Sequence, residues 1–532
     1  MGHTDRRLRI DHWIVAILLF IMALIAFINV LSRYLFHFSF AATEEITINL
    51  FVWMTVIGTG IAFERGGQLG MVTIYNKFPQ KFKRGVIVFS AALAAILFLL
   101  VDIYTVQAIY FELTLFQATS AGLGIPVWIY YIGVPILSVF CLYRHLPGCG
   151  RQAGQSEREK GRIMEIVLIS VSFLLLMALG VPIAVSLGTA AVVTIYFFDL
   201  GIGMLGVNFS TGIASFPLLA IPFFVLAGVI LEKAGLAATI ARFFELVVGR
   251  AIGGLAMVAV FTCMFWGALS GSGPATTAAV GLILLAPMLK HGYNKNFAGA
   301  TIANASDLSI IIPPSIAFII YGNITSVSVS ALFLAGVIPG LITGIGTVVV
   351  AYLISRMRGY KGLEKKGTSK EILIALKDSI WAILTPVIIL GGIYAGIFTP
   401  TEAAVVAVFY SLFVAAVIYR SINWRDFIHI LVDAAVTSSV IMFIVVFAGI
   451  FTWAASVIGV IDTAANFIVK IAPNAVVMII LVNLLLLGLG MILDAISISY
   501  LIIPILIPVL SAFKIDPLWY GVIFISTLAI GQ

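Results

Sequence analysis

The chain has 532 residues and a formal net charge of +7, with 62% hydrophobic and 10% charged residues. A soluble globular domain carries about 25% charged and about 45–50% apolar residues, so this composition excludes a soluble enzyme and indicates an integral membrane protein. The sequence contains no G-x-x-x-x-G-K-[ST] motif, so the chain is not expected to power itself with ATP. Its three cysteines predict neither a disulfide framework nor a metal site.

Long apolar segments recur along the whole chain, for example at 13–30, 86–109 and 475–493. Each includes or approaches the ~20 residues that a helix needs to span hydrocarbon, whereas a membrane β-barrel would show alternating segments of about ten residues. We therefore predict an all-α polytopic membrane protein. The basic residues lie in short loops between spans, where they set the orientation of a membrane protein rather than bind nucleic acid.

The first block, predicted for residues 1–146, contains four spans. Basic loops alternate with acidic ones along it, which places both ends of the block in the cytoplasm. The stretch 68–84 mixes apolar side chains with lysines, and both an interfacial amphipathic helix and an ordinary cytoplasmic loop fit this pattern. The four spans are expected at about 12–34, 44–63, 86–111 and 125–143.

A polar linker at 147–163 leads into a longer block, residues 164–532. A strongly basic segment at 356–370 divides this block into halves, at about 164–355 and 371–532, that resemble each other weakly. Such internal repetition is typical of transporters with inverted repeats, in which the binding site lies where the halves meet near the bilayer midplane.

The offset between the halves brings Ser272 onto Asp494 and Gly299 onto Gly521. The segment 164–199, interrupted at 180–182, is long for one membrane crossing and short for two, and this question stays open at the level of sequence.

A first break in the apolar pattern lies at 270–277, between apolar runs at 257–269 and 278–289. Each run has about 12 residues, too few to span a bilayer, and this predicts a re-entrant hairpin. Its tip would expose N–H, C=O and hydroxyl groups, which suit a carboxylate and a small hard cation, although a Gly/Ser helix-packing seam gives the same pattern. The candidate ligands here are Ser270, Gly271, Ser272, Gly273 and Thr276.

A second break surrounds the consecutive prolines Pro313 and Pro314. Because proline has no N–H and disfavours helix before it, the carbonyls of residues 309–311 are expected to lack their usual donors and to be able to ligate Na⁺. Asp307 would cost roughly 2.5–3.5 kcal/mol at the centre of a membrane helix, which favours a functional role over capping of the break. The candidates here are Asn304, Ser306, Asp307, Ile312, Pro313 and Ser315.

Two further breaks occupy the matching positions of the second half. Asp494 and Ser497 correspond to the first tip, and Ser526 and Thr527 correspond to the second break. If the repeat holds, a proline-containing break and at least one further span should follow, so the chain is expected to be truncated. The candidate Na⁺ ligands are Ser270, Ser272, Pro313 and Asp494.

These motifs resemble the TRAP (tripartite ATP-independent periplasmic) transporters, with their small and large membrane subunits fused in one chain. The segments similar to the four-helix small subunit are Asn29-Val30, Arg33-Tyr34, Glu44-Glu45, Phe51-Val52-Trp53 and Ile125-Pro126-Val127-Trp128. Those similar to the large subunit are 216–222, Ser270-Gly271-Ser272, Ile312-Pro313-Pro314-Ser315, 332–336 with Pro339-Gly340, and 398–404.

Several positions depart from the family pattern. Ser306, Asp307 and Ser309 replace a glycine-rich approach to the prolines, and the first tip carries Gly273-Pro274. These departures bear on the individual ligands and on the substrate.

The resemblance implies an elevator mechanism, in which a transport domain holding two hairpins slides against a scaffold braced by the small subunit. It implies Na⁺-coupled uptake across the bacterial inner membrane, with no cofactor beyond that ion. The solute would be an organic acid, such as a sialic acid or a dicarboxylate, delivered by a periplasmic substrate-binding protein.

Two alternatives remain. A related elevator symporter for dicarboxylates would need no binding protein, and the four-helix block argues against it. A membrane-embedded redox or proton-pumping subunit would need haem-spaced histidines or a chain of intramembrane ionisable residues, and the sequence shows neither.

Overall fold

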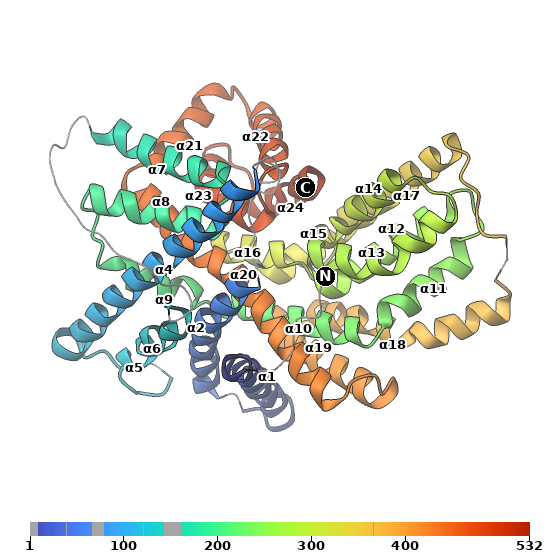
Figure 1. Cartoon of the computed structure of the whole chain (residues 1–532), viewed down its shortest axis with the longest axis horizontal. Coiled ribbons are helices and arrows are strands. Elements are labelled where there is room, and N and C mark those ends of the chain that lie inside the picture. The colour runs from blue at the N-terminus through green and yellow to red at the C-terminus, as the bar shows by residue number, and fades with distance from the viewer. Residues whose placement is uncertain (1–8, 39, 66–78, 121, 143–160, 365–366) are drawn as a thin grey trace. The chain divides into compact units, whose positions relative to one another are not determined.

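The computed structural model describes residues 9–38, 40–65, 79–120, 122–142, 161–364 and 367–532. Nearly all of these residues are helical and none of them forms a strand (Figure 1), which confirms the predicted all-α polytopic membrane protein. Among the described residues, 11 helices are long and apolar enough to cross a membrane. The 68–84 stretch lies mostly outside the described residues.

The chain divides into two compact units that are interleaved in sequence. Unit 1 therefore combines the four-helix block with parts of the longer block. Unit 1 comprises Met1–Leu219, Leu431–Asn474 and Ile496–Phe513, and unit 2 comprises Ala220–Ile430, Ala475–Ala495 and Lys514–Gln532.

Unit 1 contains the four predicted spans of the first block, and the fourth is short and split in two. Its described helices are α1 (Ile10–Phe36), α2 (Ala41–Glu64), α4 (Gln80–Phe111), the π-helix η1 (Glu112–Phe116), α5 (Trp128–Tyr131), α6 (Gly133–Leu142), α7 (Gly161–Ala178), α8 (Ile183–Phe197), α9 (Met204–Ile213), the 3₁₀ helix η2 (Phe216–Leu219), α21 (Val460–Ile471) and most of α20 (Trp424–Val457) and α23 (Ala495–Ala512).

The segment 164–199 forms two helices, α7 and α8, which pack against each other. Gly180, at φ +87°, ends the turn after α7, and Pro182 precedes the first residue of α8. A left-handed glycine followed by a proline is a strong stop and restart signal for helices. The segment is therefore divided at the point that the sequence indicated.

Small side chains join the first block to the longer block inside unit 1. A Cβ on Gly58 of α2 would lie 2.0 Å from the Oγ of Ser439 of α20, so the two helices approach at backbone distance. The Ser439 hydroxyl also lies 3.2 Å from the carbonyl of Met54, to which it donates. An exposed ion pair between Arg65 and Asp433, at 2.8 Å, adds to the same interface and is worth about 0–1 kcal/mol.

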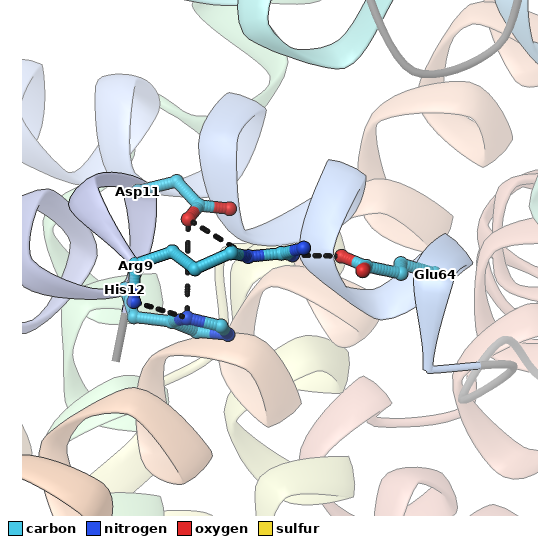
Figure 2. Close-up of polar contacts among 4 residues, drawn as sticks. All are labelled: Arg9, Asp11, His12 and Glu64. Carbon is cyan, nitrogen blue, oxygen red and sulfur yellow. Dashed lines mark hydrogen bonds and ion pairs between the residues drawn. The ribbon is translucent and has the colours of Figure 1, made fainter. Parts of the chain in front are cut away.

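A polar cluster links the start of α1 to the end of α2. Figure 2 shows the Arg9 guanidinium between the carboxylates of Asp11 and Glu64, and its Nη2 donates to the Oε2 of Glu64. The His12 ring lies on the same side of Asp11 as Arg9, with its Nδ1 at 3.8 Å from Oδ1. The contact with Glu64 raises the pKa of Arg9 above its usual value, so this arginine stays charged.

Unit 2 holds the first two sequence breaks. Its helices are α10 (Ala220–Lys233), α11 (Leu236–Val248), α12 (Gly254–Ser270), α13 (Gly273–Lys290), α14 (Lys295–Ser306), α15 (Leu308–Ile311), α16 (Ile316–Thr325), α17 (Val329–Met357), α18 (Ser369–Tyr394), α19 (Pro400–Phe413), the π-helix η3 (Val414–Ile418), α22 (Ala475–Gly490) and α24 (Pro517–Gly531).

The motif at 398–404 starts α19 with a capping box. Thr399 is the N-cap residue, Pro400 is the first helical residue, and the Glu402 amide lies 3.3 Å from the Thr399 hydroxyl. The Glu402 carboxylate in turn accepts from the Thr399 amide at 2.9 Å. These residue types at this spacing form the standard start of a helix, so the motif has a structural explanation.

The helices α12, α13 and α14 pack against one another in unit 2 (Figure 1). α12 has 17 residues and α13 has 18, so the predicted arm length of about 12 residues is wrong. Gly273 and Pro274, which the sequence places in the tip of the hairpin, form the first turn of α13, where proline costs no hydrogen bond. The re-entrant character of this pair of helices stays a prediction.

Candidate functional site

The first break is a turn of two residues, Gly271 and Ser272, between α12 and α13. Gly271 adopts a left-handed conformation at φ +60°, which an L-residue with a side chain reaches only at a cost. Ser272 is extended and is the N-cap residue of α13. A Cβ on Gly271 would lie 2.8 Å from the carbonyl oxygen of Pro314, so this turn touches the second break directly.

The hydroxyls of the first break form hydrogen bonds mainly with other residues of the same break. Ser270 Oγ and Thr276 Oγ1 lie 2.9 Å apart and both residues are buried. Ser270 Oγ is also 3.4 Å from both the amide and the carbonyl of Ser272. Ser270 and Thr276 therefore hold the turn in shape, while Ser272 is partly exposed.

At the second break the prolines remove two helix donors. The carbonyls of Ser309 and Ile310 would bond to the amides of residues 313 and 314, which are both proline. The Ser315 hydroxyl donates to the Ile310 carbonyl at 2.5 Å, so one of the three carbonyls predicted to be available is occupied. Within the described part of the chain, no donor is recorded for the Ser309 carbonyl.

Two further serines of this region are used in packing. The Ser306 hydroxyl donates to the Ile302 carbonyl at 2.6 Å, and the Ser309 hydroxyl donates to the Ser306 carbonyl at 2.6 Å. Both serines are fully buried. The Cys263 thiol of α12 lies 3.6 Å from Ser306 Oγ. Ser306 and Ser315 thus support the break, whereas Asn304 is exposed on α14.

The two breaks face each other inside unit 2. The amide of Ile316 lies 3.4 Å from the Gly271 carbonyl, to which it donates. A Cβ on Gly273 would be 3.2 Å from Asp307 Oδ1. Asp307 is half-buried. Its backbone carbonyl accepts from the Ile310 amide at 3.0 Å, but no hydrogen bond or ion pair between its carboxylate and another described residue is recorded. The carboxylate thus points at the first turn of α13 without an internal partner.

The backbone approach depends on a residue that the sequence reasoning missed. A Cβ on Gly267 would lie 2.7 Å from the Cα of Ser309, so α12 and α15 touch along their backbones. Gly267 follows Cys263 by four residues, so both lie on one face of α12, and the Gly271 turn begins four residues after Gly267. This spacing of small residues was the signal that could have identified the contact face.

Some of the candidate residues from the second half of the longer block lie on helices that pack near the two breaks. α24 carries Ser526 and Thr527 and packs against α15, and the Ser526 hydroxyl is buried with no partner among the described residues. A Cβ on Gly490 would be 3.0 Å from the Cα of Gly531, so the end of α22 also touches α24. Asp494 lies in the turn after α22, in unit 2.

Ser497 is the one candidate outside this grouping. It lies on α23, in a segment that belongs to unit 1.

The atoms of the described residues that could ligate a metal ion here are mainly oxygens: the Ser309 carbonyl, the hydroxyls of the first break and the Asp307 carboxylate. Oxygen donors of this kind suit small hard cations. No group of three or more His, Cys, Asp and Glu residues occurs in the described part of the chain. A cation site for Na⁺ at these oxygens and an anion site at the amides at the start of α13 stay predictions.

Two family models match the chain. The model of the tripartite ATP-independent periplasmic transporter DctM component matches residues 170–532, and that of the DctQ component matches residues 22–148.

Three curated proteins illustrate the similarity. The isethionate TRAP transporter permease protein DctMQ of Oleidesulfovibrio alaskensis is 32% identical over 92% of this chain and 80% of its own length. The C4-dicarboxylate TRAP transporter large permease protein of Vibrio cholerae is 36% identical over 69% of this chain and 86% of its own length. The sialic acid TRAP transporter large permease protein of the same organism is 38% identical over 61% of this chain and 77% of its own length.

Residues 149–169, which include most of the predicted polar linker, lie between the two matched regions, with the small component before them and the large component after them. With 11 helices among its described residues that are long and apolar enough to cross a membrane, the chain is a multi-pass protein of the bacterial inner membrane. It belongs to the TRAP transporters, and it joins their DctQ and DctM components in a single polypeptide.

Proposed function

We propose that this chain is the membrane permease for Na⁺-driven uptake of a small organic acid, which a periplasmic binding protein delivers. The permease would act as a transporter and not as an enzyme. The alternative, a symporter that needs no binding protein, predicts equal uptake with and without that protein.

The observation that carries the proposal is the meeting of two helix breaks around Asp307. The carboxylate faces the first turn of α13, and the Gly271 turn touches the carbonyl of Pro314. A carboxylate at membrane depth is costly, so it is expected to have a function. A bound Na⁺ would neutralise that charge, and the organic acid would then meet the amides of α13 without repulsion from Asp307.

The substrate class rests on the relatives. Their names assign isethionate, C4-dicarboxylates and sialic acid to those proteins. All of these substrates are organic acids that are anionic at neutral pH. We therefore expect the present chain to transport a small organic anion, and we expect the soluble binding protein to select which of these anions is transported.

An elevator mechanism remains part of the proposal. It requires a body that carries the site and a second body that stays fixed, and the chain does divide into two compact units. Unit 2 contains both breaks and would be the moving body. Unit 1 contains the four-helix block and would be the scaffold.

The experiment is uptake into proteoliposomes that contain the full chain. External Na⁺ and a soluble binding protein loaded with radiolabelled organic acid are added together, and then each is omitted in turn. We expect uptake only when both are present. Full uptake with K⁺ in place of Na⁺ would remove the ion coupling, and full uptake of free solute would favour the symporter alternative.

A further inference from the structure

Three segments of unit 2 that touch one another carry cations and no carboxylate. We call residues 249–254, 290–297 and 355–363 the basic face. All of its cationic side chains are exposed, and no ion pair with a described residue is recorded for any of them. These cations are Arg250, Lys290, Lys295, Arg356, Arg358 and Lys361.

Aromatic stacking joins two of these segments. The rings of Tyr293 and Tyr360 are stacked with their centroids 4.4 Å apart. The Asn294 amide donates to the Tyr360 hydroxyl at 3.1 Å, and the Gly253 amide lies 3.3 Å from the Tyr360 carbonyl, to which it donates. Tyr360 therefore contacts both of the other segments, and Tyr293 itself is buried.

Backbone contacts complete the arrangement. The Leu363 amide donates to the Gly249 carbonyl at 2.9 Å. A Cβ on Gly362 would lie 2.1 Å from the Arg250 carbonyl oxygen, so the backbones of these two segments are in direct contact. The Arg358 guanidinium lies over the ring of Phe297, 5.3 Å from its centroid. The segments that carry the cations are therefore held together by backbone and aromatic contacts.

The basic face lies at the ends of membrane helices. α12 begins at Gly254, α13 ends at Lys290, α14 begins at Lys295 and α17 ends at Met357. Four apolar helices that start or stop together place the face at one membrane surface. Its positive charge identifies that surface as the cytoplasmic one.

Exposed apolar side chains lie among the cations. Met357, between Arg356 and Arg358, is 85% exposed, and Ile252, next but one to Arg250, is 43% exposed. A soluble anion or a nucleic acid gives such side chains nothing to contact. A lipid gives both parts of the pattern a partner, because its phosphate meets the cations and its acyl chains meet Met357 and Ile252.

We propose that the basic face of unit 2 binds the headgroup of an anionic phospholipid of the cytoplasmic leaflet. The bound lipid would hold together the outer ends of α12, α13, α14 and α17, whose other ends form or approach the two breaks. This inference does not depend on the nature of the transported solute. It assigns a ligand to residues that the transport mechanism does not use.

The test is native mass spectrometry of the purified full chain after equilibration with mixed micelles of phosphatidylglycerol and phosphatidylcholine. We expect preferential retention of phosphatidylglycerol by the unaltered chain. The variant Arg356→Gln/Arg358→Gln/Lys361→Gln should reduce that retention at least about fivefold, because three of the cations are removed. Equal retention of the two lipids would overturn the proposal and leave the cations with a role in orientation only.

A matched control removes the same charge elsewhere in unit 2. The variant Lys377→Gln/Arg420→Gln/Arg425→Gln replaces three exposed cations outside the basic face and should change retention less than about twofold. An equal loss in both variants would overturn the assignment to this face.

Two further samples test whether retention depends on charge at this face and whether the ligand is a lipid or a free phosphate. The charge-conserving variant Arg356→Lys/Arg358→Lys should keep most of the retention, and its loss would contradict a headgroup site based on charge. Free glycerol 3-phosphate at the same concentration as the lipid should not displace phosphatidylglycerol, because it offers nothing to Met357 and Ile252. Full displacement would contradict a membrane ligand.

Discussion

The first residue of α13, Gly273, lies against the carboxylate of Asp307: a Cβ on the glycine would be 3.2 Å from Asp307 Oδ1. One residue belongs to the first helix break and the other to the second. Their contact means that any change in the Asp307 side chain acts on the start of α13. It also leaves little space between them, so the size of residue 273 controls the room at the carboxylate.

Gly273→Ala should therefore lower uptake several-fold with little loss of folded protein. The new methyl group would force Asp307 to move by a few tenths of an ångström, while the helical backbone tolerates alanine. Gly299→Ala on α14 is the matched control, because nothing lies within 4 Å of that position. Uptake per folded protein is the measurement, and equal uptake in the two variants would contradict the contact.

Gly271→Ala combines backbone strain with a steric overlap. The φ of +60° costs an alanine about 1–2 kcal/mol, and its Cβ would lie 2.8 Å from the Pro314 carbonyl. Gly235→Ala is the control, because Gly235 has a φ of +77° but no neighbour within 4 Å. Both variants should lose thermal stability, and Gly271→Ala should lose more stability and also uptake. Equal losses would show that the contact with Pro314 contributes nothing.

Asp307→Asn should weaken the apparent Na⁺ affinity of uptake by about tenfold or more, because a neutral amide replaces the only carboxylate at the described breaks of the first half. Asp199→Asn is a suitable control, since Asp199 is exposed and asparagine tolerates its φ of +50°. Uptake is measured against Na⁺ concentration and normalised to folded protein. An unchanged Na⁺ dependence in the Asp307 variant removes this residue from the ion site.

Asp494→Asn and Ser272→Ala test the pairing of the two halves. If the Asp494 carboxylate takes part in ion binding, its replacement should weaken Na⁺ dependence or abolish uptake. Ser272→Ala should have the smaller effect, because backbone groups can supply most ligands of that turn. A lower thermal stability of Asp494→Asn with an unchanged apparent Na⁺ affinity would point to a scaffold role instead.

Gly58→Ala should lower the free energy of unfolding by about 1–3 kcal/mol, because its Cβ would overlap the Ser439 hydroxyl at 2.0 Å. Adding Ser439→Gly removes that overlap and should restore part of the loss, although the hydrogen bond to Met54 is then missing. A double-mutant cycle over the two positions gives the coupling energy. Additive effects would contradict direct packing of α2 against α20.

Composition and apolar segments were enough to predict the membrane class, the four spans of the first block and three of the four places where helices break. The fourth predicted break, around Ser526 and Thr527, is wrong, because α24 continues without interruption from Pro517 to Gly531. The prolines at 313–314 and Gly271 mark those breaks because their backbone chemistry excludes a regular helix. The arm lengths were wrong because Gly273 and Pro274 serve equally well as loop residues and as the first turn of a helix.

The partners of individual hydroxyls could not be predicted from the sequence. Ser306 and Ser315 were expected to be ligands, yet their hydroxyls donate to the carbonyls of Ile302 and Ile310. A serine in a helix break can face a cavity or bond to its own backbone, and sequence spacing does not distinguish the two. The contact of Gly267 with Ser309 likewise depends on how α12 crosses α15, which is a property of the packing.

The most direct test of the proposed function is initial uptake of a radiolabelled organic acid into proteoliposomes under an inward Na⁺ gradient. The solute is supplied on its periplasmic binding protein, and the Asp307→Asn variant is measured beside the unaltered chain. The account predicts uptake that needs both Na⁺ and the binding protein and that falls sharply in the variant. Uptake at the same rate in K⁺ alone, with the variant as active as the unaltered chain, would contradict it.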